Sequence, residues 1–255
     1  MQAVSVREIV KAITKATVFR NLSLASRLYG FVQRAGFHVA PGPDPTAALL
    51  RAFAISCVLD VGANSGQFGR RLRLAGYNGR IVSFEPVDEP YRRLAETAKH
   101  DARWRAVQLA LGDRAGSATI HVSSYSQYSS LLGQTGFCIQ NHPGAEPIAD
   151  EVVPVKRLDD VFQDYVRADD QVLLKVDTQG FERAVLDGAS AVLPQIRGVH
   201  LEVSFKAMYQ GELLAPEMID RLSRDGFTLV LLEPLYHMLE PGKLAQADAL
   251  FFRLP

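Results

Sequence analysis

The stretch Cys57-Val-Leu-Asp-Val-Gly-Ala-Asn-Ser-Gly66 decides the fold. An apolar run that carries Asp60 leads directly into Gly62, and small or polar residues continue to Gly66. Open α/β sheets bind their ligands beyond the carboxyl ends of their strands, and glycines allow backbone to approach such a ligand closely. The stretch therefore predicts a first strand with a ligand site at its end.

The rest of the chain alternates β-rich runs with helical patterns. This alternation predicts parallel βαβ units in a sheet covered on both faces. The last two strands are close in sequence, so we expect them to form an antiparallel pair. Strands are expected at 56–62, 80–86, 105–113, 172–177, 198–203, 228–233 and 249–254, and helices at 67–75, 89–100, 181–193 and 215–225.

Length and composition set limits on the class of protein. The 255 residues fit one large domain with an appendage, and the zero net formal charge gives no general reason to expect nucleic acid as a partner. Cys57 and Cys138 form neither a metal-ligand spacing nor a disulfide framework. No apolar run reaches the roughly 18 residues of a membrane-spanning helix, and the N-terminus lacks a signal-peptide pattern. We expect a cytoplasmic protein.

Residues 1–45 are expected to form an N-terminal helical segment ahead of a main domain at 46–255. Apolar residues recur there at helical spacing, with basic residues between them and a single acid, Glu8. Two interpretations stay open. The basic residues are the solvated face of helices that cover the main domain, or the segment makes peripheral contact with an anionic membrane surface.

An insertion at about 115–157 interrupts the alternation. The runs 117–124 and 150–158 resemble extra strands, and the residues between them show no clear periodicity. A connection of this length predicts a lid or binding loop, for which we expect Tyr125–Pro147 to be mobile until ligands bind. The alternative is a disordered surface excursion.

Three strand ends together indicate the ligand. A dinucleotide site favours G-x-G-x-x-G, but Asn64 stands where the second glycine would be, so the turn suits a ligand without a pyrophosphate. Glu85 ends the second strand, where an acid accepts hydrogen bonds from ribose hydroxyls. Asp113 follows the third strand and is placed to meet an adenine edge. An adenosine compound without a pyrophosphate fits all three, and S-adenosylmethionine is such a compound.

At these motifs the chain resembles the FkbM-type family of class I S-adenosylmethionine-dependent methyltransferases. The resemblance lies in "DVGANSGQF", "FEP", "ALGD", "SSL", "KVDTQGFE" and "HLEVSF", in that order over about 55–235. It implies a Rossmann-like α/β fold with a seven-stranded, mostly parallel sheet and an antiparallel last strand. It also implies O-methylation of a hydroxyl on a sugar, glycolipid or other natural-product acceptor. The cofactor-binding residues that it implies are Asp60, Gly62, Asn64 and Gly66 beside the methionine part, Glu85 at the ribose and Asp113 at the adenine.

Charged residues in two central strands are the catalytic candidates. Lys175 and Asp177 share one face of their strand, and His200 and Glu202 share one face of the next. One interpretation is a pair of internal ion pairs. The other places Asp177, Glu202 and His200 at the reaction site, where a base would take the proton of the acceptor hydroxyl.

The sequence leaves the mechanism and two other functions open. Asp177 and Glu202 could instead hold Mg²⁺ against a sugar diol. His121 and His142 are weaker candidates, because a single loop histidine is usually a surface residue. A nicotinamide-dependent oxidoreductase and a non-catalytic S-adenosylmethionine-binding subunit are the alternative functions.

Overall fold

A computed structural model describes residues 44–237 and 244–254 of the chain. The helices expected in the first 45 residues therefore fall almost wholly outside the described residues. The described part begins with α3 (Pro45–Ala52), a helix for which the sequence analysis made no prediction. Proline suits the first turn of a helix, since its missing N–H would have no partner there.

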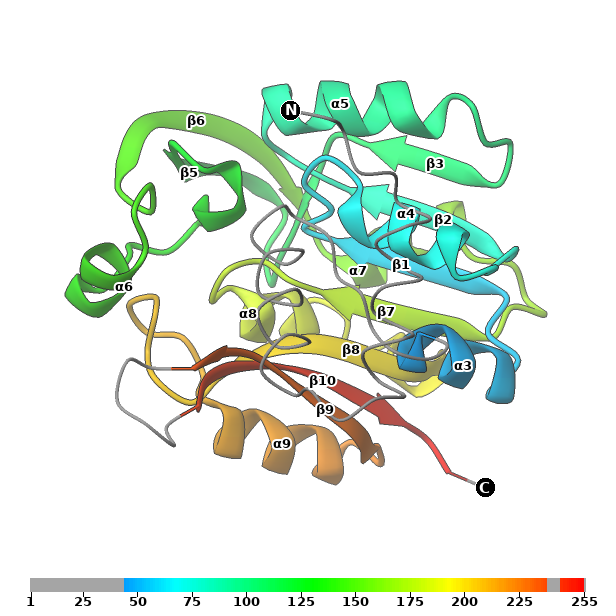
Figure 1. Ribbon diagram of the computed structural model, residues 1–255. Coiled ribbons are helices and arrows are strands. Elements are labelled where there is room, and N and C mark those ends of the chain that lie inside the picture. Colours follow the sequence, from blue (N-terminus) through cyan, green and yellow to red (C-terminus); the bar gives the residue numbers. More distant parts are fainter. Residues whose placement is uncertain (1–43, 238–243, 255) are drawn as a thin grey trace, which may run out of the picture. The chain divides into compact units, whose positions relative to one another are not determined.

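A seven-stranded sheet forms the centre of the domain (Figure 1). Six strands run in one direction, and the last strand of the chain, β10, is antiparallel to both of its neighbours. The prediction of a mostly parallel sheet with an antiparallel last strand is confirmed. The spatial order is β3 (Trp104–Val107), β2 (Arg80–Phe84), β1 (Cys57–Val61), β7 (Val172–Val176), β8 (Ile196–Ser204), β10 (Leu244–Phe252) and β9 (Thr228–His237).

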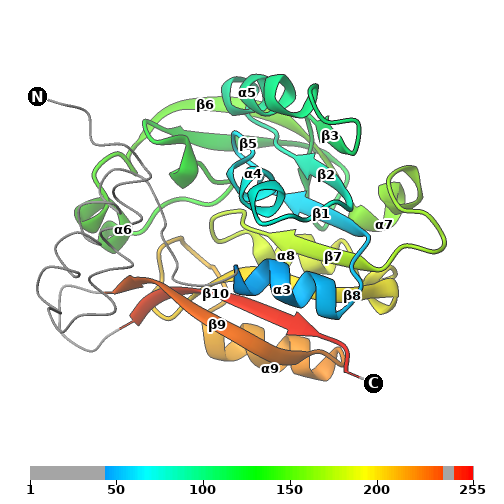
Figure 2. The same cartoon turned by 45° about the vertical axis from the view of Figure 1, so that its right-hand side comes forward.

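Helices cover both faces of this sheet (Figures 1 and 2). One apolar cluster joins the strands to α3, α4 (Gln67–Leu74) and α5 (Asp88–Ala98). Another joins them to α7 (Leu158–Val161), α8 (Glu182–Asp187) and α9 (Ala215–Arg224). Every residue of β1 and β7 is buried, as expected for central parallel strands.

The helix α8 is much shorter than the expected 181–193. It ends at Asp187, and a Cβ on the next residue, Gly188, would lie 1.9 Å from the carbonyl oxygen of Gly112. After this close approach the carboxylate of Asp159 accepts hydrogen bonds from the backbone N–H groups of Ala191 and Val192, 3.0 and 3.1 Å away. The remaining residues of the predicted helix form a turn instead, which leads into the 3₁₀ segment η3 (Leu193–Gln195).

The strand expected at 105–113 is two strands in two different sheets. The last hydrogen bond of this strand to the main sheet is at Val107, whose carbonyl oxygen accepts from the Glu85 N–H at 3.0 Å. The chain then joins a second, three-stranded sheet, where Gly112 donates to Lys156 at 3.0 Å. The order of that sheet is β4 (Ala110–Leu111), β6 (Pro147–Lys156) and β5 (Gly116–Ser123).

The insertion supplies β5 and β6 as expected, but the segment between them is not irregular throughout. It contains η1 (Ser126–Tyr128) and α6 (Gly136–Asn141). Cys138 in α6 is fully buried in an apolar cluster that includes Met208 and Tyr209, which follow β8. The expectation of a segment without regular structure is wrong on this point. Its mobility in the absence of ligands stays a prediction.

Candidate functional site

A row of buried polar side chains crosses four neighbouring strands on the sheet face that α4 covers. The Cα register aligns Ser83 of β2 with Asp60 of β1, Asp60 with Lys175 of β7, and Lys175 with His200 of β8. All four side chains are buried. Buried polar groups are costly without partners, so the bonds within this row determine what it can do.

Lys175 links the row to the glycine turn. Its Nζ lies 3.1 Å from Asp60 Oδ1, 3.2 Å from the carbonyl oxygen of Gly62 and 3.4 Å from Asp177 Oδ2. Burial opposes the charge on this ammonium, but the nearby carboxylates of Asp60 and Asp177 raise its pKa. Lys175 therefore stays a cation and holds three segments together at the carboxyl ends of β1 and β7.

Asp60 lies beneath the turn and has no exposed surface. Its Oδ2 accepts from Ser83 Oγ at 2.8 Å, and Ser83 Oγ accepts in turn from the indole Nε1 of Trp104 at 3.0 Å. Its other oxygen faces Lys175, so both carboxylate oxygens of Asp60 already have partners within the protein. Its contribution to the site in this structure is to position Lys175 and the turn.

The turn at Gly62 is possible because that residue has no side chain. Its φ is +73°, and a Cβ there would lie 1.9 Å from the carbonyl oxygen of Asp177. The ends of β1 and β7 thus approach more closely than any other residue would allow. Asn64 follows with φ +46°, a conformation that asparagine tolerates better than most residues.

Glu85 faces this turn from the end of β2. The side chain is buried, and its two carboxylate oxygens accept from the backbone N–H groups of Asn64 at 2.8 Å and Val87 at 2.9 Å. Burial raises the pKa of Glu85 to about 7, against the lowering effect of those two hydrogen bonds. Each oxygen keeps a further lone pair, so the carboxylate has capacity for a pair of hydroxyl donors.

The sequence analysis expected Asp113 after the third strand of the main sheet, but the preceding strand belongs to the second sheet. Asp113 follows β4 in the second sheet, its side chain is about half exposed, and its Oδ2 is 3.6 Å from Nε of Arg114. The residue that follows β3 directly is Gln108, whose Nε2 donates to the carbonyl oxygen of Pro86, next to Glu85, at 3.5 Å. Gln108 is a second candidate for the adenine edge, and the break between β3 and β4 hid it from sequence reasoning.

Asp177 and Glu202 come together through Gln179. The Gln179 Nε2 donates to Asp177 Oδ1 at 2.8 Å and lies 3.5 Å from Glu202 Oε1. Its Oε1 accepts from the hydroxyl of Tyr209 at 2.6 Å. Gln179 has φ +57°, which is unusual for a residue with a long side chain. The sequence reasoning missed Gln179, although its place in "DTQG" directly after Asp177 was a usable signal.

Glu202 is enclosed more tightly than Asp177. Its Oε1 accepts from Gln246 Nε2 at 2.5 Å, whereas the Asp177 side chain is 34% exposed. Burial and the nearby charges of Asp177 and Asp248 raise the pKa of Glu202 well above its usual range. The two carboxyl groups thus differ in environment, with Asp177 the more accessible of the two.

His200 pairs with a residue that the sequence analysis did not consider. Its Nε2 lies 3.4 Å from Asp248 Oδ1 in β10, and its ring packs 5.3 Å from the ring of Phe68. Burial acts against the carboxylate of Asp248, but the hydrogen bond and charge of His200 keep the pKa of Asp248 low. The idea of two internal ion pairs is thus right for Lys175 with Asp177 and wrong for His200 with Glu202.

Glu182 holds the turn that presents Asp177. Its buried Oε1 accepts from the backbone N–H groups of Thr178 and Gly180 at 2.8 and 3.2 Å. Burial raises the pKa of Glu182 to about 7, although these hydrogen bonds lower it. The carboxyl group has no exposed face toward the site, so its role is to shape the turn.

The insertion touches both halves of the site. Asn64 Nδ2 donates to Ser126 Oγ at 2.9 Å, and Ser130 Oγ donates to the carbonyl oxygen of Gln179 at 2.6 Å. His121 pairs with Asp150 at 2.7 Å, and His142 accepts or donates at Nδ1 with the Tyr128 hydroxyl at 2.9 Å. These contacts lie within the insertion, and both histidines stay weaker candidates than the residues at the strand ends.

Asp177 and Glu202, the Mg²⁺ ligands of the alternative mechanism, face amide and ammonium groups in this structure. Amide groups of Gln179 and Gln246 face Asp177 and Glu202, and the Lys175 ammonium lies 3.4 Å from Asp177. Within residues 44–237 and 244–254, no group of three or more His, Cys, Asp or Glu side chains is arranged to hold a metal ion. In the same ranges no helix has the length and apolar composition needed to cross a membrane.

Comparison with known sequences identifies a family. The family described as the methyltransferase FkbM domain matches residues 60–229. This range contains the glycine turn, Glu85, Asp177 and Glu202, and it covers about two thirds of the chain.

Three individual proteins show how far the similarity extends. The 2-O-methyltransferase NoeI of Sinorhizobium fredii is 27% identical over 174 residues, which are 65% of this chain and 70% of NoeI. The AMB antimetabolite synthetase AmbE of Pseudomonas aeruginosa is 28% identical over 200 residues, 67% of this chain but only 9% of AmbE. The crystal structure of magnesium protoporphyrin IX methyltransferase (ChlM) from Synechocystis PCC 6803 with bound SAM superposes with a TM-score of 0.45 at 13% identity, over 100% of both chains.

Proposed function

The chain belongs to the FkbM family of methyltransferases, and we propose that it uses S-adenosylmethionine to methylate a hydroxyl group of a sugar, glycolipid or other natural-product acceptor. One observation carries the proposal. The glycine turn, the Glu85 carboxylate and the Asp177 carboxylate meet at one edge of the sheet, and Lys175 links the turn to Asp177. A cofactor site and a base for the acceptor thus adjoin each other.

The residues at the turn suit S-adenosylmethionine. Glu85 has a buried carboxyl group with free lone pairs for the ribose hydroxyls, and Gly62, Asn64 and Gly66 would lie along the methionine part. When bound, the cofactor supplies an electrophilic methyl group. Gln108 or Asp113 would contact the adenine edge, and Asp60 would act through Lys175 rather than by direct contact.

We assign the base to Asp177. A hydroxyl is a poor nucleophile while it keeps its proton, so a carboxylate within hydrogen-bond reach accelerates the reaction. Asp177 follows β7 and is partly exposed. Lys175 contacts both Asp177 and the carbonyl oxygen of Gly62, so it connects the carboxylate to the glycine turn. Glu202 accepts from Gln246, and burial and the nearby charge of Asp177 raise its pKa, while His200 is paired with Asp248. Glu202 and His200 then shape the environment of Asp177.

The choice of a hydroxyl acceptor rests on NoeI. That relative is a 2-O-methyltransferase, and its similarity extends over 70% of its own length. AmbE offers no comparable guide, because the chain spans less than a tenth of it. Among the proposed sugar acceptors, the hydroxyl at position 2 is therefore the first to test.

The direct test is transfer from S-adenosylmethionine labelled on the methyl group. Glycosides would be offered in pairs that differ only in the hydroxyl at position 2, with Asp177→Asn as the enzyme control. We expect labelled product from one class of glycoside, lost with the 2-deoxy partner and strongly reduced in the variant. Tight cofactor binding without transfer to any acceptor would instead support a non-catalytic subunit. Binding of a nicotinamide cofactor in place of S-adenosylmethionine would support the oxidoreductase alternative.

A further inference from the structure

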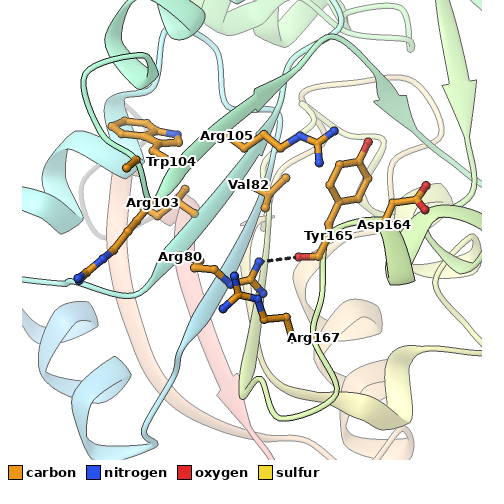
Figure 3. A pocket seen from close by; sticks show the side chains of 10 residues that line it. Arg80, Val82, Arg103, Trp104, Arg105, Asp164, Tyr165 and Arg167 are labelled. Atoms are coloured by element: carbon orange, nitrogen blue, oxygen red, sulfur yellow. Dashed lines mark hydrogen bonds between the residues drawn. The ribbon is translucent and has the colours of Figure 1, made fainter.

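A second pocket lies at the opposite edge of the sheet from the methyl-transfer site. Its walls are the first residues of β2 and β3, the turn before β3 and the segment after η2 (Phe162–Asp164), shown in Figure 3. Parallel strands place their amino ends together, away from the carboxyl ends where Glu85 and Asp177 lie. A ligand here would not contact the reacting groups.

Arginine dominates the lining. Arg80, Arg103, Arg105 and Arg167 line the pocket together with Asp164, and Asp170 pairs with Arg80. Arg103 and Asp164 point away from the pocket, so the three other guanidinium groups and the Asp170 carboxylate leave a formal charge of +2. Figure 3 shows Arg103 extended away from the pocket, where it donates to the carbonyl oxygen of Asn78 at 2.9 Å. Arg80, Arg105 and Arg167 are the cations that remain at the pocket.

The carboxylate beside Arg80, that of Asp170, already has other hydrogen-bond partners. Asp170 accepts from Ser56 Oγ at 2.9 Å and from the backbone N–H of Arg167 at 2.7 Å, in addition to its pair with Arg80. The guanidinium of Arg167 reaches toward that of Arg80 in Figure 3. Asp164 turns away beyond Tyr165. Asp170 thus binds the guanidinium of Arg80 and the backbone N–H of Arg167, so a single carboxylate faces these two arginines.

The pocket is partly preorganised. Arg80 is fixed by Asp170 and by a 3.0 Å hydrogen bond to the carbonyl oxygen of Tyr165. The Tyr165 ring packs edge-on against Phe84, with centroids 5.0 Å apart, and Cζ of Arg105 lies over the same Tyr165 ring, 4.8 Å from its centroid. Fixed donors lose less conformational entropy when they bind an anion, so this arrangement favours binding over a set of freely moving side chains.

We propose that this pocket binds a phosphate group, either free or as the monoester of a larger compound. A formal charge of +2 matches a dianion, and guanidinium groups bind phosphate oxygens through paired hydrogen bonds. The cavity of about 200 Å³ is smaller than the roughly 300–1,000 Å³ of sites that enclose drug-sized ligands. It therefore has room for the phosphate group itself, with the rest of a monoester in solvent.

Calorimetry with inorganic phosphate and with glycerol 3-phosphate tests the site. The test variant is Arg105→Gln with Arg167→Ala, and the matched control is Arg92→Ala with Arg114→Gln, which removes the same charge from exposed arginines elsewhere. We expect one saturable site in the native protein, weakened by at least about tenfold in the test variant and unchanged in the control. Thermal melting of both variants checks that each is folded.

Vesicles with and without phosphatidic acid form a second arm, which separates the two sources of phosphate. Binding to the acidic vesicles that the test variant loses and the control keeps would place the phosphate on a lipid. Binding of the soluble compounds alone would place it on a metabolite. The proposal is overturned if neither arm gives saturable binding, or if the test variant binds as well as the control.

Discussion

Gln179 Nε2 donates a 2.8 Å hydrogen bond to Asp177 Oδ1, and it does so from a backbone held at φ +57°. A non-glycine residue in this conformation costs free energy. The surrounding bonds offset that cost, because the Gln179 carbonyl accepts from Ser130 and its amide oxygen accepts from Tyr209. The insertion, the proposed base and the segment after β8 are thus joined through one residue, by its backbone carbonyl and its side-chain amide.

Replacing Gln179 tests whether this link positions the base. Gln179→Ala should lower turnover by about tenfold or more, since a charge-assisted hydrogen bond to the carboxylate is lost. Cofactor affinity should stay nearly unchanged. Gln179→Gly is the matched variant, because it removes the same amide but relieves the backbone. Full activity in the glycine variant would assign the effect to strain and not to the amide.

Asp177→Asn keeps the shape of the side chain and removes its basicity. We expect turnover to fall by roughly 100-fold or more, the lower range for one acid–base group. Cofactor binding, measured by calorimetry, should change little, because Lys175 keeps Asp60 as a partner. If Asp177 only stabilises Lys175, the variant should instead melt at a lower temperature and keep its turnover.

The metal alternative for Asp177 and Glu202 has its own test. Treatment of the native protein with EDTA, followed by addition of Mg²⁺, should leave the rate unchanged if Asp177 acts as a base. A loss of activity with EDTA that added Mg²⁺ reverses would contradict the base assignment and favour a coordinating role for the two carboxylates.

Glu85→Ala should weaken S-adenosylmethionine binding by about 2 kcal/mol, through loss of charge-assisted hydrogen bonds to the ribose. The pKa of Glu85 in the free protein is about 7, and the ionised form is the better acceptor. Affinity in the native protein should therefore fall as the pH drops below about 7, because the carboxyl group must lose a proton to bind. Calorimetry at pH 5.5 to 8.5 measures both effects, and a pH-independent native affinity would remove Glu85 from the ribose site.

Glu182 gives a prediction for stability. Its pKa is raised from 4.5 to about 7 in the folded protein, so the folded state holds a proton that the unfolded state releases between these values. This contribution is present below pH 4.5 and is lost as the pH rises through 7, by on the order of 3 kcal/mol. Glu182→Gln should remove that dependence, so the melting temperature of the variant relative to the native protein should rise between pH 5 and pH 8. A constant difference would contradict the raised pKa.

The insertion should respond to ligands. We expect Tyr125–Pro147 to exchange its amide hydrogens quickly in the free protein and slowly with cofactor and acceptor, because closure excludes water from the transfer step. Ser126 already contacts Asn64 in the glycine turn, so the region around η1 should be protected first. Hydrogen exchange by mass spectrometry measures this, with α9 as an internal reference. Identical exchange in all states would count against a lid.

Local sequence patterns were sufficient to predict most strands of the sheet. The run Cys57–Val61 is a strand between two others because apolar residues lie on both of its faces, with Asp60 as the polar exception, and the glycine turn after it followed from Gly62. The positions of Glu85 and Asp177 at strand ends could also be predicted. Each of these features depends on residues within a few positions of one another, and local propensity and periodicity report them directly.

The partners of the polar side chains depended on the tertiary structure. His200 pairs with Asp248 and Glu202 with Gln246, because β10 inserts between β8 and β9, and no local pattern records that order. The break of the third strand after Val107 likewise depends on Lys156 in a second sheet, because its carbonyl oxygen accepts a hydrogen bond from the backbone N–H of Gly112. Sequence alone therefore determined which segments form strands and where the ligand turn lies. The pairs of Lys175 with Asp60 and of His200 with Asp248 were decided by contacts between segments more than 40 residues apart, since only folding brings those groups within bonding distance.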